Sequence, residues 1–309
     1  MYLYRGAINI WLLRSQEMSR ISQTFADLKR DHRRGFIPFI TAGDPDLETT
    51  LLLIIELAKA GATLIELGVP FTDPMADGPV IQRASERALK HSFGLAEIFQ
   101  IVAGARKQTG VPIILFSYFN PLLQFSLSDN DGRTSPPSKH FGTGLEAGLV
   151  PPDTPGFEKL ARAAKAAGVD GILVTDLVPE EAGEFADALR ANDLDMIFLV
   201  APTSTDERLQ MIAELASGFI YAVSRAGITG ARDEMSSEAE RLVGRVRRFS
   251  DLPVAVGFGI STPDQVADVW RYADAAVVGS AIVAEIEKAS SAGEVVSRIG
   301  QFVRELISD

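Results

Sequence analysis

The sequence contains no cysteine among its 309 residues. Disulfide bonds, thiolate metal sites and cysteine nucleophiles are therefore excluded. This absence is compatible with a reducing compartment, and we expect a cytoplasmic protein. Histidine is almost as scarce, because the chain has only His32, His91 and His140. Their spacing fits no metal site, so we expect no bound metal.

The chain also lacks an excess of positive charge. It has 30 lysine and arginine residues against 41 aspartate and glutamate residues, a net charge of −11. Such a surface repels nucleic acid and anionic membranes, so we expect neither as a partner. No apolar run approaches the roughly 18 residues that span a membrane. Residues 1–17 hold a short apolar piece without a signal-peptide cleavage site, and we expect an N-terminal extension outside the fold.

What the chain does have is a regular alternation of apolar strand-like runs and helical patterns. The strand-like runs are Phe36–Thr41, Thr63–Leu67, Pro112–Ser117, Gly171–Thr175, Met196–Val200, Gly218–Ala222, Leu252–Val256 and Ala275–Val278. The helical patterns are Ser19–Arg33, Leu47–Ala60, Pro79–Lys90, Leu95–Gln108, Phe157–Ala167, Pro179–Asn192, Thr205–Ala216, Ser236–Ser250, Thr262–Tyr272, Ser280–Ala289 and Ala292–Ser308.

This alternation predicts an α/β protein of the (βα)8 TIM-barrel class, with an N-terminal helix. We expect a single barrel domain over residues 18–309. A doubly wound open sheet is the alternative. The first turn, Thr41–Asp46, lacks the glycine fingerprint of that fold.

One segment interrupts the alternation. Residues 126–155, in the third strand-to-helix connection, are rich in serine, glycine, proline and aspartate and show no apolar period. We interpret them as a long inserted loop at the end of the barrel where active sites lie. Long loops in compact domains are usually functional or disordered, and this composition favours disorder.

Carboxylates mark the end of the second expected strand. The period of two places Glu66 on the same face as Leu64, where an ionisable side chain is costly unless it is paired or used. Asp73 and Asp77 follow in a loop rich in glycine and proline. Glu66 and Asp77 would suit general acid–base catalysis. The alternative, a partly exposed glutamate and a helix-capping aspartate, fits this stretch equally well.

Glycine-rich turns follow the last two expected strands. Gly257–Ser261 follows the seventh, and Gly279 and Ser280 open the helix after the eighth. Backbone N–H groups at such turns bind phosphate in many barrels. Glycine also makes ordinary tight turns, but the pair at these two positions favours phosphate.

The sixth expected strand is followed by residues 224–230, where two glycines flank small and hydroxyl side chains. This composition suits a mobile lid, although an ordinary surface loop would show it too. Tyr221 lies just before the loop. A tyrosine in a barrel strand is usually a core residue, and its hydroxyl needs a partner that a carboxylate such as Glu66 could supply.

Taken together, these stretches resemble the family of tryptophan synthase α subunits. The similar stretches are Phe36–Asp46, Ile65–Leu89, Gly171–Glu181, Tyr221–Gly230, Gly257–Ser261 and Val277–Val283. The run ELGVPFTDPMADGP, Glu66–Pro79, is long and highly specific. The similarity covers roughly residues 18–125 and 156–309.

The resemblance implies a (βα)8 barrel that cleaves indole-3-glycerol phosphate to indole and glyceraldehyde 3-phosphate without a metal or organic cofactor of its own. It also implies an α2β2 complex, in which a β subunit carrying pyridoxal phosphate receives the indole through a tunnel.

The resemblance also implies roles for individual residues. The family's catalytic carboxylates fall on Glu66 and Asp77. Its substrate-binding positions fall on Phe39, Tyr221, Thr229, Gly230, Phe258, Gly259, Gly279 and Ser280. Phe39 and Phe258 match residues that flank the indole ring, Thr229 matches the lid threonine, and the glycines and Ser280 match phosphate-binding positions. Asp73 matches a loop position that communicates with the β subunit.

The sequence departs from the family pattern at residues 1–17 and 126–155. The second segment lies where family members approach the β subunit, so it puts complex formation in doubt more than the chemistry. One alternative is therefore a non-catalytic subunit that only activates a β subunit, although the intact carboxylates argue against it. Another is a different phosphate-binding barrel, such as indole-3-glycerol phosphate synthase. That enzyme would need a catalytic lysine at a strand end, and none of the expected strands has one.

Overall fold

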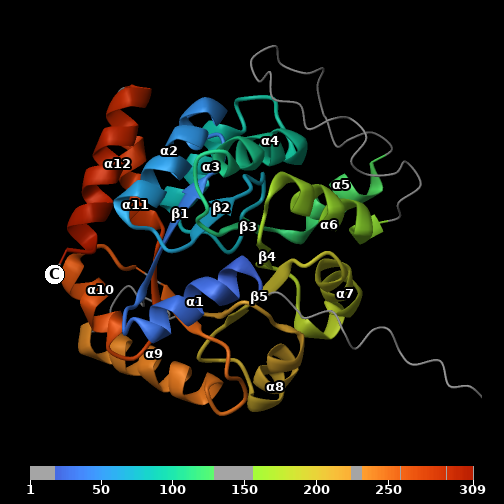
Figure 1. Cartoon of the computed structure of the whole chain (residues 1–309), viewed down its shortest axis with the longest axis vertical. Coiled ribbons are helices and arrows are strands. Elements are labelled where there is room, and N and C mark those ends of the chain that lie inside the picture. The colour runs from blue at the N-terminus through green and yellow to red at the C-terminus, as the bar shows by residue number, and fades with distance from the viewer. Residues whose placement is uncertain (1–17, 129–155, 224–231, 258, 290, 309) are drawn as a thin grey trace, which may run out of the picture.

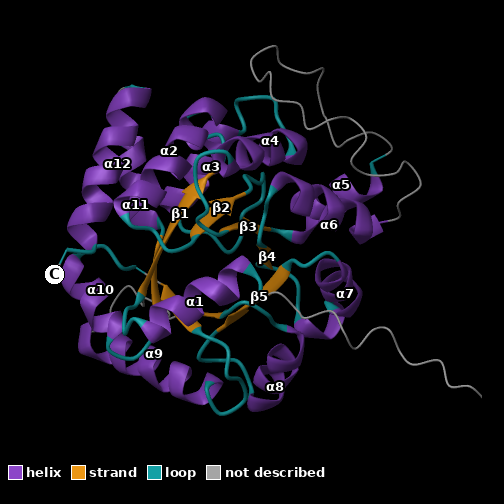
Figure 2. Ribbon diagram, viewed as in Figure 1, coloured by secondary structure: helices purple, strands orange, loops and turns teal. Residues whose placement is uncertain are grey.

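The computed structural model describes residues 18–128, 156–223, 232–257, 259–289 and 291–308. The expected extension at 1–17 lies outside these residues. Parallel strands close into a barrel (Figure 2). They follow one another in chain order, and β1 pairs with both β2 and β8. The strands are β1 (Gly35–Thr41), β2 (Ile65–Gly68), β3 (Ile113–Ser117), β4 (Gly171–Val174), β5 (Asp195–Val200), β6 (Ile220–Val223), β7 (Val254–Gly257) and β8 (Ala275–Val278). The predicted (βα)8 barrel is confirmed.

Helices surround this barrel (Figure 1). They are α1 (Arg20–Arg30), α2 (Leu47–Ala60), α3 (Pro79–Ala88), α4 (Leu95–Arg106), α5 (Phe119–Leu127), α6 (Gly156–Ala167), α7 (Gly183–Ala191), α8 (Asp206–Leu215), α9 (Arg232–Val246), α10 (Pro263–Trp270), α11 (Ser280–Glu287) and α12 (Ala292–Leu306). Local sequence sets several of their ends. For example, the Asp46 side chain accepts a hydrogen bond from Thr49 N at the start of α2, and Gly61 ends that helix with a φ of 110°.

Alternating side chains along the strands build two cores. Inward-facing residues, from Ile37 on β1 to Val277 on β8, fill the barrel interior. Outward-facing residues such as Ile40 pack against the helices. The predicted N-terminal helix, α1, closes the N-terminal end of the barrel, because Phe25 joins the interior core and its ring lies 5.7 Å from that of Phe219.

The third connection differs from the expectation at its start. Ser126 and Leu127, assigned to the inserted loop, belong to α5, a helix that the sequence pattern did not reveal. The Ser126 hydroxyl donates to Leu122 O one turn earlier, which lets a serine sit inside a helix. Residues 129–155 lie outside the described residues, so their predicted disorder remains a prediction. Helix α9 also begins four residues before the expected Ser236.

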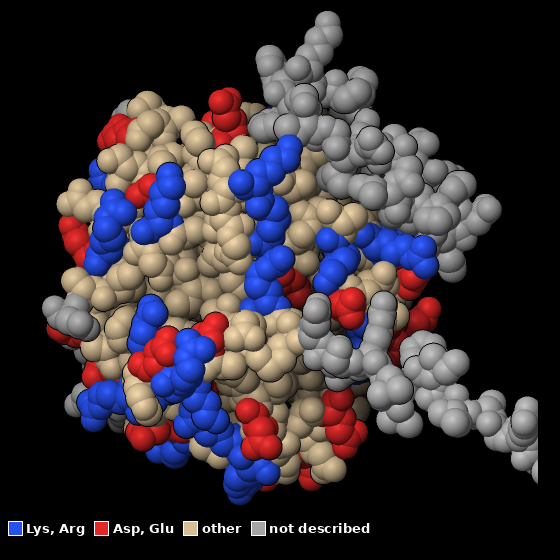
Figure 3. Space-filling model, viewed as in Figure 1, with Lys and Arg blue, Asp and Glu red and all other residues tan. Residues whose placement is uncertain are grey.

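No helix in the described part of the chain is both long and apolar enough to cross a membrane. On the face shown in Figure 3, acidic and basic side chains lie next to one another over the lower part of the barrel. Such mixing follows from ion pairs like Arg247–Asp274 and Arg34–Asp274.

Candidate active site

Strand β2 places Glu66 inside the mouth of the barrel. Leu64 belongs to the interior core while Ile65 and Leu67 belong to the outer one, so the alternation turns Glu66 inward. Glu66 is only 1% exposed, and its Oε1 makes no hydrogen bond with the described part of the chain. Burial without a compensating cation raises the pKa of Glu66 well above its usual value. A carboxyl group in this state keeps its proton to a higher pH than an exposed glutamate does, which suits a general acid.

Tyr221 on β6 faces the same interior. It is 8% exposed, and burial, followed by the negative charge of Glu66, raises the pKa of its hydroxyl well above the ordinary value. The hydrogen bond between Tyr221 and Glu66 that the sequence suggested does not form in the structure. Gly257 on the neighbouring strand makes room for the tyrosine, because a Cβ there would lie 2.3 Å from its hydroxyl oxygen.

Asp77 lies in the loop between β2 and α3 and is partly buried. Burial raises the pKa of Asp77 to about 6, and a hydrogen bond from Tyr118 opposes this rise. The Tyr118 hydroxyl also accepts from Ala76 N at 2.9 Å. Gln82 Nε2 on α3 donates to the Asp77 carbonyl at 2.9 Å. Tyr118 and Gln82 therefore hold the loop in place, and this is a role that the sequence reasoning missed. Tyr118 follows β3 directly, which is the one signal that could have identified it.

Phe39 forms an apolar wall beside Glu66. It lies opposite Glu66 in the β1–β2 pairing, and its ring packs edge-on against Phe116, with centroids 5.3 Å apart. Gly68 has to be a glycine, because a Cβ there would lie 2.5 Å from the Phe39 ring. Phe258, the other residue expected to flank an aromatic substrate, lies outside the described residues.

The expected phosphate-binding end is only partly described. Gly279 precedes α11 and supplies no side chain to cap it, which leaves the first N–H groups of that helix available to an anion. Gly259 adopts a φ of 63°, a conformation that favours glycine. Both Gly279 and Ser280 are accessible to solvent. Thr229 and Gly230 lie outside the described residues.

An ion-pair network connects α3, which follows Asp77, to α11. Arg87 donates two hydrogen bonds of 2.8 Å to Asp44, which is 1% exposed, and a third to Glu287. Arg83 donates two more to Glu287. The loop that carries Asp77 and the expected phosphate-binding turn before α11 are thereby linked through α3 and α11. Asp44, in the loop after β1, is therefore a buried ion-pair partner.

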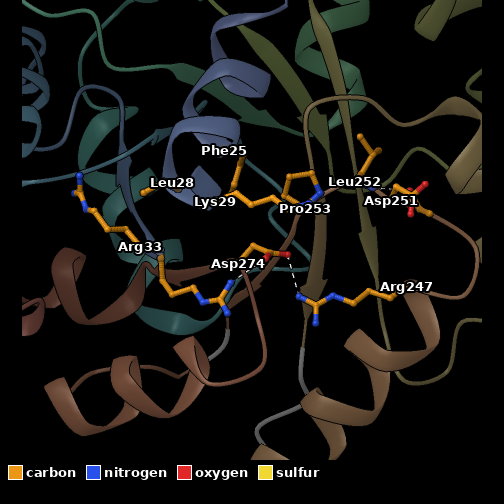
Figure 4. Close-up of a pocket in the computed structure, with 11 residues that line it drawn as sticks. Phe25, Leu28, Lys29, Arg33, Arg247, Asp251, Leu252, Pro253 and Asp274 are labelled. Atoms are coloured by element: carbon orange, nitrogen blue, oxygen red, sulfur yellow. Dashed lines mark hydrogen bonds and ion pairs between the residues drawn. The ribbon is translucent and has the colours of Figure 1, made fainter. Parts of the chain in front are cut away.

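Asp73 lies apart from these groups. It is exposed and lines a surface cavity of about 290 Å³ between the loop and α3, together with Met75, which is 84% exposed. A second cavity, of about 340 Å³, lies between α1 and the end of α9 (Figure 4). Three of the charged side chains that line it pair with one another, since Asp274 binds both Arg34 and Arg247. No group of three or more potential metal ligands occurs within the described ranges.

Comparison with known proteins identifies the family. The family described as "Tryptophan synthase alpha chain" matches residues 25–130 and 152–308. The chain is 45% identical over 289 residues to the tryptophan synthase alpha chain of Geobacter sp. (strain M21), covering 94% of this chain and 97% of the relative. It is 47% identical over 276 residues to that of Caulobacter sp. (strain K31), covering 89% and 90%.

Solved structures agree with this result. The structure of tryptophan synthase subunit alpha from Legionella pneumophila superposes with a TM-score of 0.78 at 34% identity, over 94% of this chain and 97% of that one. A chain of the tryptophan synthase α2β2 complex from Pyrococcus furiosus gives 0.74 at 38% identity, over 88% and 97%. With the family matched on both sides of residues 131–151, the chain belongs to the tryptophan synthase alpha chain family.

Proposed function

We propose that this chain cleaves indole-3-glycerol phosphate to indole and glyceraldehyde 3-phosphate, with Glu66 and Asp77 as its two catalytic carboxylates. The observation that carries the proposal is the buried Glu66 Oε1, which has no partner in the described protein. A buried carboxyl group without a partner in the mouth of a barrel destabilises the fold, but it is free to interact with a bound substrate.

The reaction needs two different carboxyl groups. In the retro-aldol step, indole C3 gains a proton, the ring nitrogen carries positive charge, and a glycerol hydroxyl loses its proton. Glu66, whose pKa burial raises, exchanges protons between that hydroxyl and C3. Asp77, with a pKa of about 6, is mostly ionised at neutral pH and accepts a hydrogen bond from the indole N–H. Their different environments give the two groups different tasks.

The remaining contacts position the substrate. Phe39 and Phe258 flank the indole ring, and Tyr221 faces the barrel interior close to Glu66. The N–H groups at Gly230, Gly259, Gly279 and Ser280 bind the phosphate, while Thr229 belongs to a lid. Anchoring both ends of the substrate leaves the reacting carbon facing Glu66, and such positioning supplies much of the rate enhancement.

The indole then passes to a β subunit. The α2β2 assembly of the Pyrococcus furiosus relative supports this partner. The pyridoxal phosphate belongs to that β subunit, and Asp73, exposed on the β2–α3 loop, communicates with it. We infer a cytoplasmic location for the complex.

Replacing Glu66 by glutamine tests the proposal. Glutamine keeps the size of the side chain but cannot transfer the proton. We expect indole release from indole-3-glycerol phosphate to fall by roughly 10²–10⁴-fold, the usual effect of a general acid or base. Glu48→Gln on the exposed start of α2 is the matched control and should keep full turnover.

Near-normal turnover by Glu66→Gln would refute the assignment. Mixing with a β subunit separates the enzyme from a purely activating subunit. The wild type should both change β activity and release indole, whereas a non-catalytic subunit would do only the first.

A further inference from the structure

Within the described residues, two buried side-chain polar atoms lack a hydrogen-bond partner, Glu66 Oε1 and Thr41 Oγ1. Thr41 is 2% exposed and ends β1, the strand next to the one that carries Glu66. A buried hydroxyl without a partner is rare in a native protein and calls for an explanation. The proposed reaction explains the unpaired Glu66 carboxyl, but it does not explain the unpaired Thr41 hydroxyl.

The alternation of β1 turns Thr41 toward the barrel mouth. Ile37 belongs to the barrel interior, Phe39 packs against Phe116, and Ile40 belongs to the outer core. The period of two therefore places Thr41 on the same side as Phe39, one step nearer the C-terminal end of the barrel. Its pairing neighbour on β2 is Gly68, which has no side chain to offer the hydroxyl a partner.

Thr41 also stands between the two ends of the proposed site. Its strand pairs with β2 on one side and β8 on the other. Glu66 lies on β2, and Gly279 follows β8 against Phe39, where a Cβ would lie 3.5 Å from the Phe39 Cβ. If the reacting carbon of the substrate lies at Glu66 and its phosphate at Gly279, the carbon chain between them lies over the end of β1.

We propose that the Thr41 hydroxyl binds the hydroxylated three-carbon chain of the substrate by a hydrogen bond to a glycerol hydroxyl. This proposal rests on the proposed function and adds a binding residue to it. A site that holds a polar group without a partner of its own discriminates against a ligand lacking the matching hydroxyl. Thr41 would thereby select a hydroxylated linker over a plain alkyl one.

Two substitutions at this position test the proposal. Thr41→Val keeps the shape and removes the hydroxyl, while Thr41→Ser keeps the hydroxyl. For Thr41→Val we expect kcat/KM for indole-3-glycerol phosphate to fall roughly 10–100-fold. Thr41→Ser should stay within about three-fold of wild type. Thermal unfolding of Thr41→Val should occur at or above the wild-type temperature, because the substitution removes a buried group that has no partner.

Thr50→Val is the matched control. The Thr50 hydroxyl is also buried, but it donates to Asp46 O at 2.8 Å and accepts from Gly43 N at 2.9 Å. Its removal should lower the unfolding temperature with little change in kcat/KM. Opposite effects on stability and catalysis at the two threonines separate substrate binding from structural support.

A substrate analogue with a propyl chain in place of the glycerol provides an independent readout. Its dissociation constant should be equal for wild type and Thr41→Val, since it has no hydroxyl to lose. Equal kcat/KM for wild type and Thr41→Val would overturn the proposal, as would a loss shared by Thr41→Ser or an equal loss of affinity for the analogue. A wild type that releases no indole, or an active Glu66→Gln variant, would instead refute the proposed function.

Discussion

The two ends of the barrel treat buried carboxylates in opposite ways. At the N-terminal end, Asp170 is 7% exposed and accepts hydrogen bonds from Arg20, Arg106 and Ile113 N. Asp195 beside it accepts from the Ser19 hydroxyl at 2.6 Å. At the C-terminal end, Glu66 is more deeply buried, and its Oε1 has no partner in the described chain.

This difference shows where the fold gains stability and where it gives stability up. The paired acids connect α1 and α4 to the strands and close the barrel. Leaving Glu66 unpaired costs free energy that a bound substrate can recover. Under the proposed function, buried acids are therefore structural at one end of the barrel and catalytic at the other.

Disrupting the ion pairs of Asp170 at the N-terminal end of the barrel should have the largest effect on stability. Arg106→Met leaves Asp170 with only the half-exposed Arg20 as a cation, and it also removes the hydrogen bond to Gly168 O. We expect a loss of about 3–5 kcal/mol in unfolding free energy, the usual result of stranding one partner of a buried pair. Urea unfolding followed by circular dichroism measures it.

The exposed pair of Arg30 with Asp27 supplies the control for that prediction. Both side chains are largely accessible, and Arg30→Met should leave the unfolding free energy close to that of the wild type. Equal losses for Arg106→Met and Arg30→Met would mean that the buried network does not stabilise the closed end.

At the C-terminal end of the barrel, removing a buried charge should raise the unfolding free energy instead of lowering it. Burial raises the pKa of Glu66 above the ordinary 4.5, so the folded state keeps a proton that the unfolded chain releases. The wild type therefore loses stability as pH rises from about 4.5 toward the raised pKa. The side chain of the Glu66→Gln variant cannot ionise. At pH 8 we expect the unfolding free energy of this variant to exceed that of the wild type by roughly 1–3 kcal/mol, within the usual cost of a buried unsatisfied group.

Unfolding free energies of both proteins at pH 5 and pH 8 would show this effect as a gap that widens with pH. A gap that narrows as pH rises would contradict the assignment of Glu66 as an unpaired acid.

The sequence predicts the scaffold better than it predicts the partners of individual groups. The eight strands follow from apolar runs, and Ala275–Val278 agrees with β8 at both ends. Helix α5 escaped notice because it is short and has a proline at its third residue. Its aromatic residues pack on α6, with the Phe119 and Phe157 rings 5.7 Å apart. That contact joins segments separated by the whole inserted region, so no local pattern reveals it.

The sequence could predict those site residues whose side chains are energetically unfavourable at their expected positions. Glu66 could be singled out because an ionisable group on an apolar strand face demands a reason. Thr41 could not, because a threonine at a strand end is ordinary until the packing shows that its hydroxyl has no partner. For Tyr118 the sequence offers only its position directly after β3, and the fold then shows its hydroxyl in contact with the Asp77 loop.

The smallest expected effect concerns that tyrosine. In the proposed reaction Asp77 is an ionised hydrogen-bond acceptor, so kcat/KM should fall as pH drops through its pKa of about 6. The hydrogen bond from Tyr118 favours the ionised form, and Tyr118→Phe should therefore move the acidic limb to higher pH. A shift of roughly half a unit to one unit matches a hydrogen bond of about 0.5–1.5 kcal/mol. The pH profile of kcat/KM measures the shift, and Asp77→Asn should abolish the limb in whatever activity remains. If the acidic limb of the pH profile is unchanged in Tyr118→Phe, the Tyr118 hydroxyl does not influence the pKa of Asp77. Its contact with Ala76 N would then be its only role at this loop.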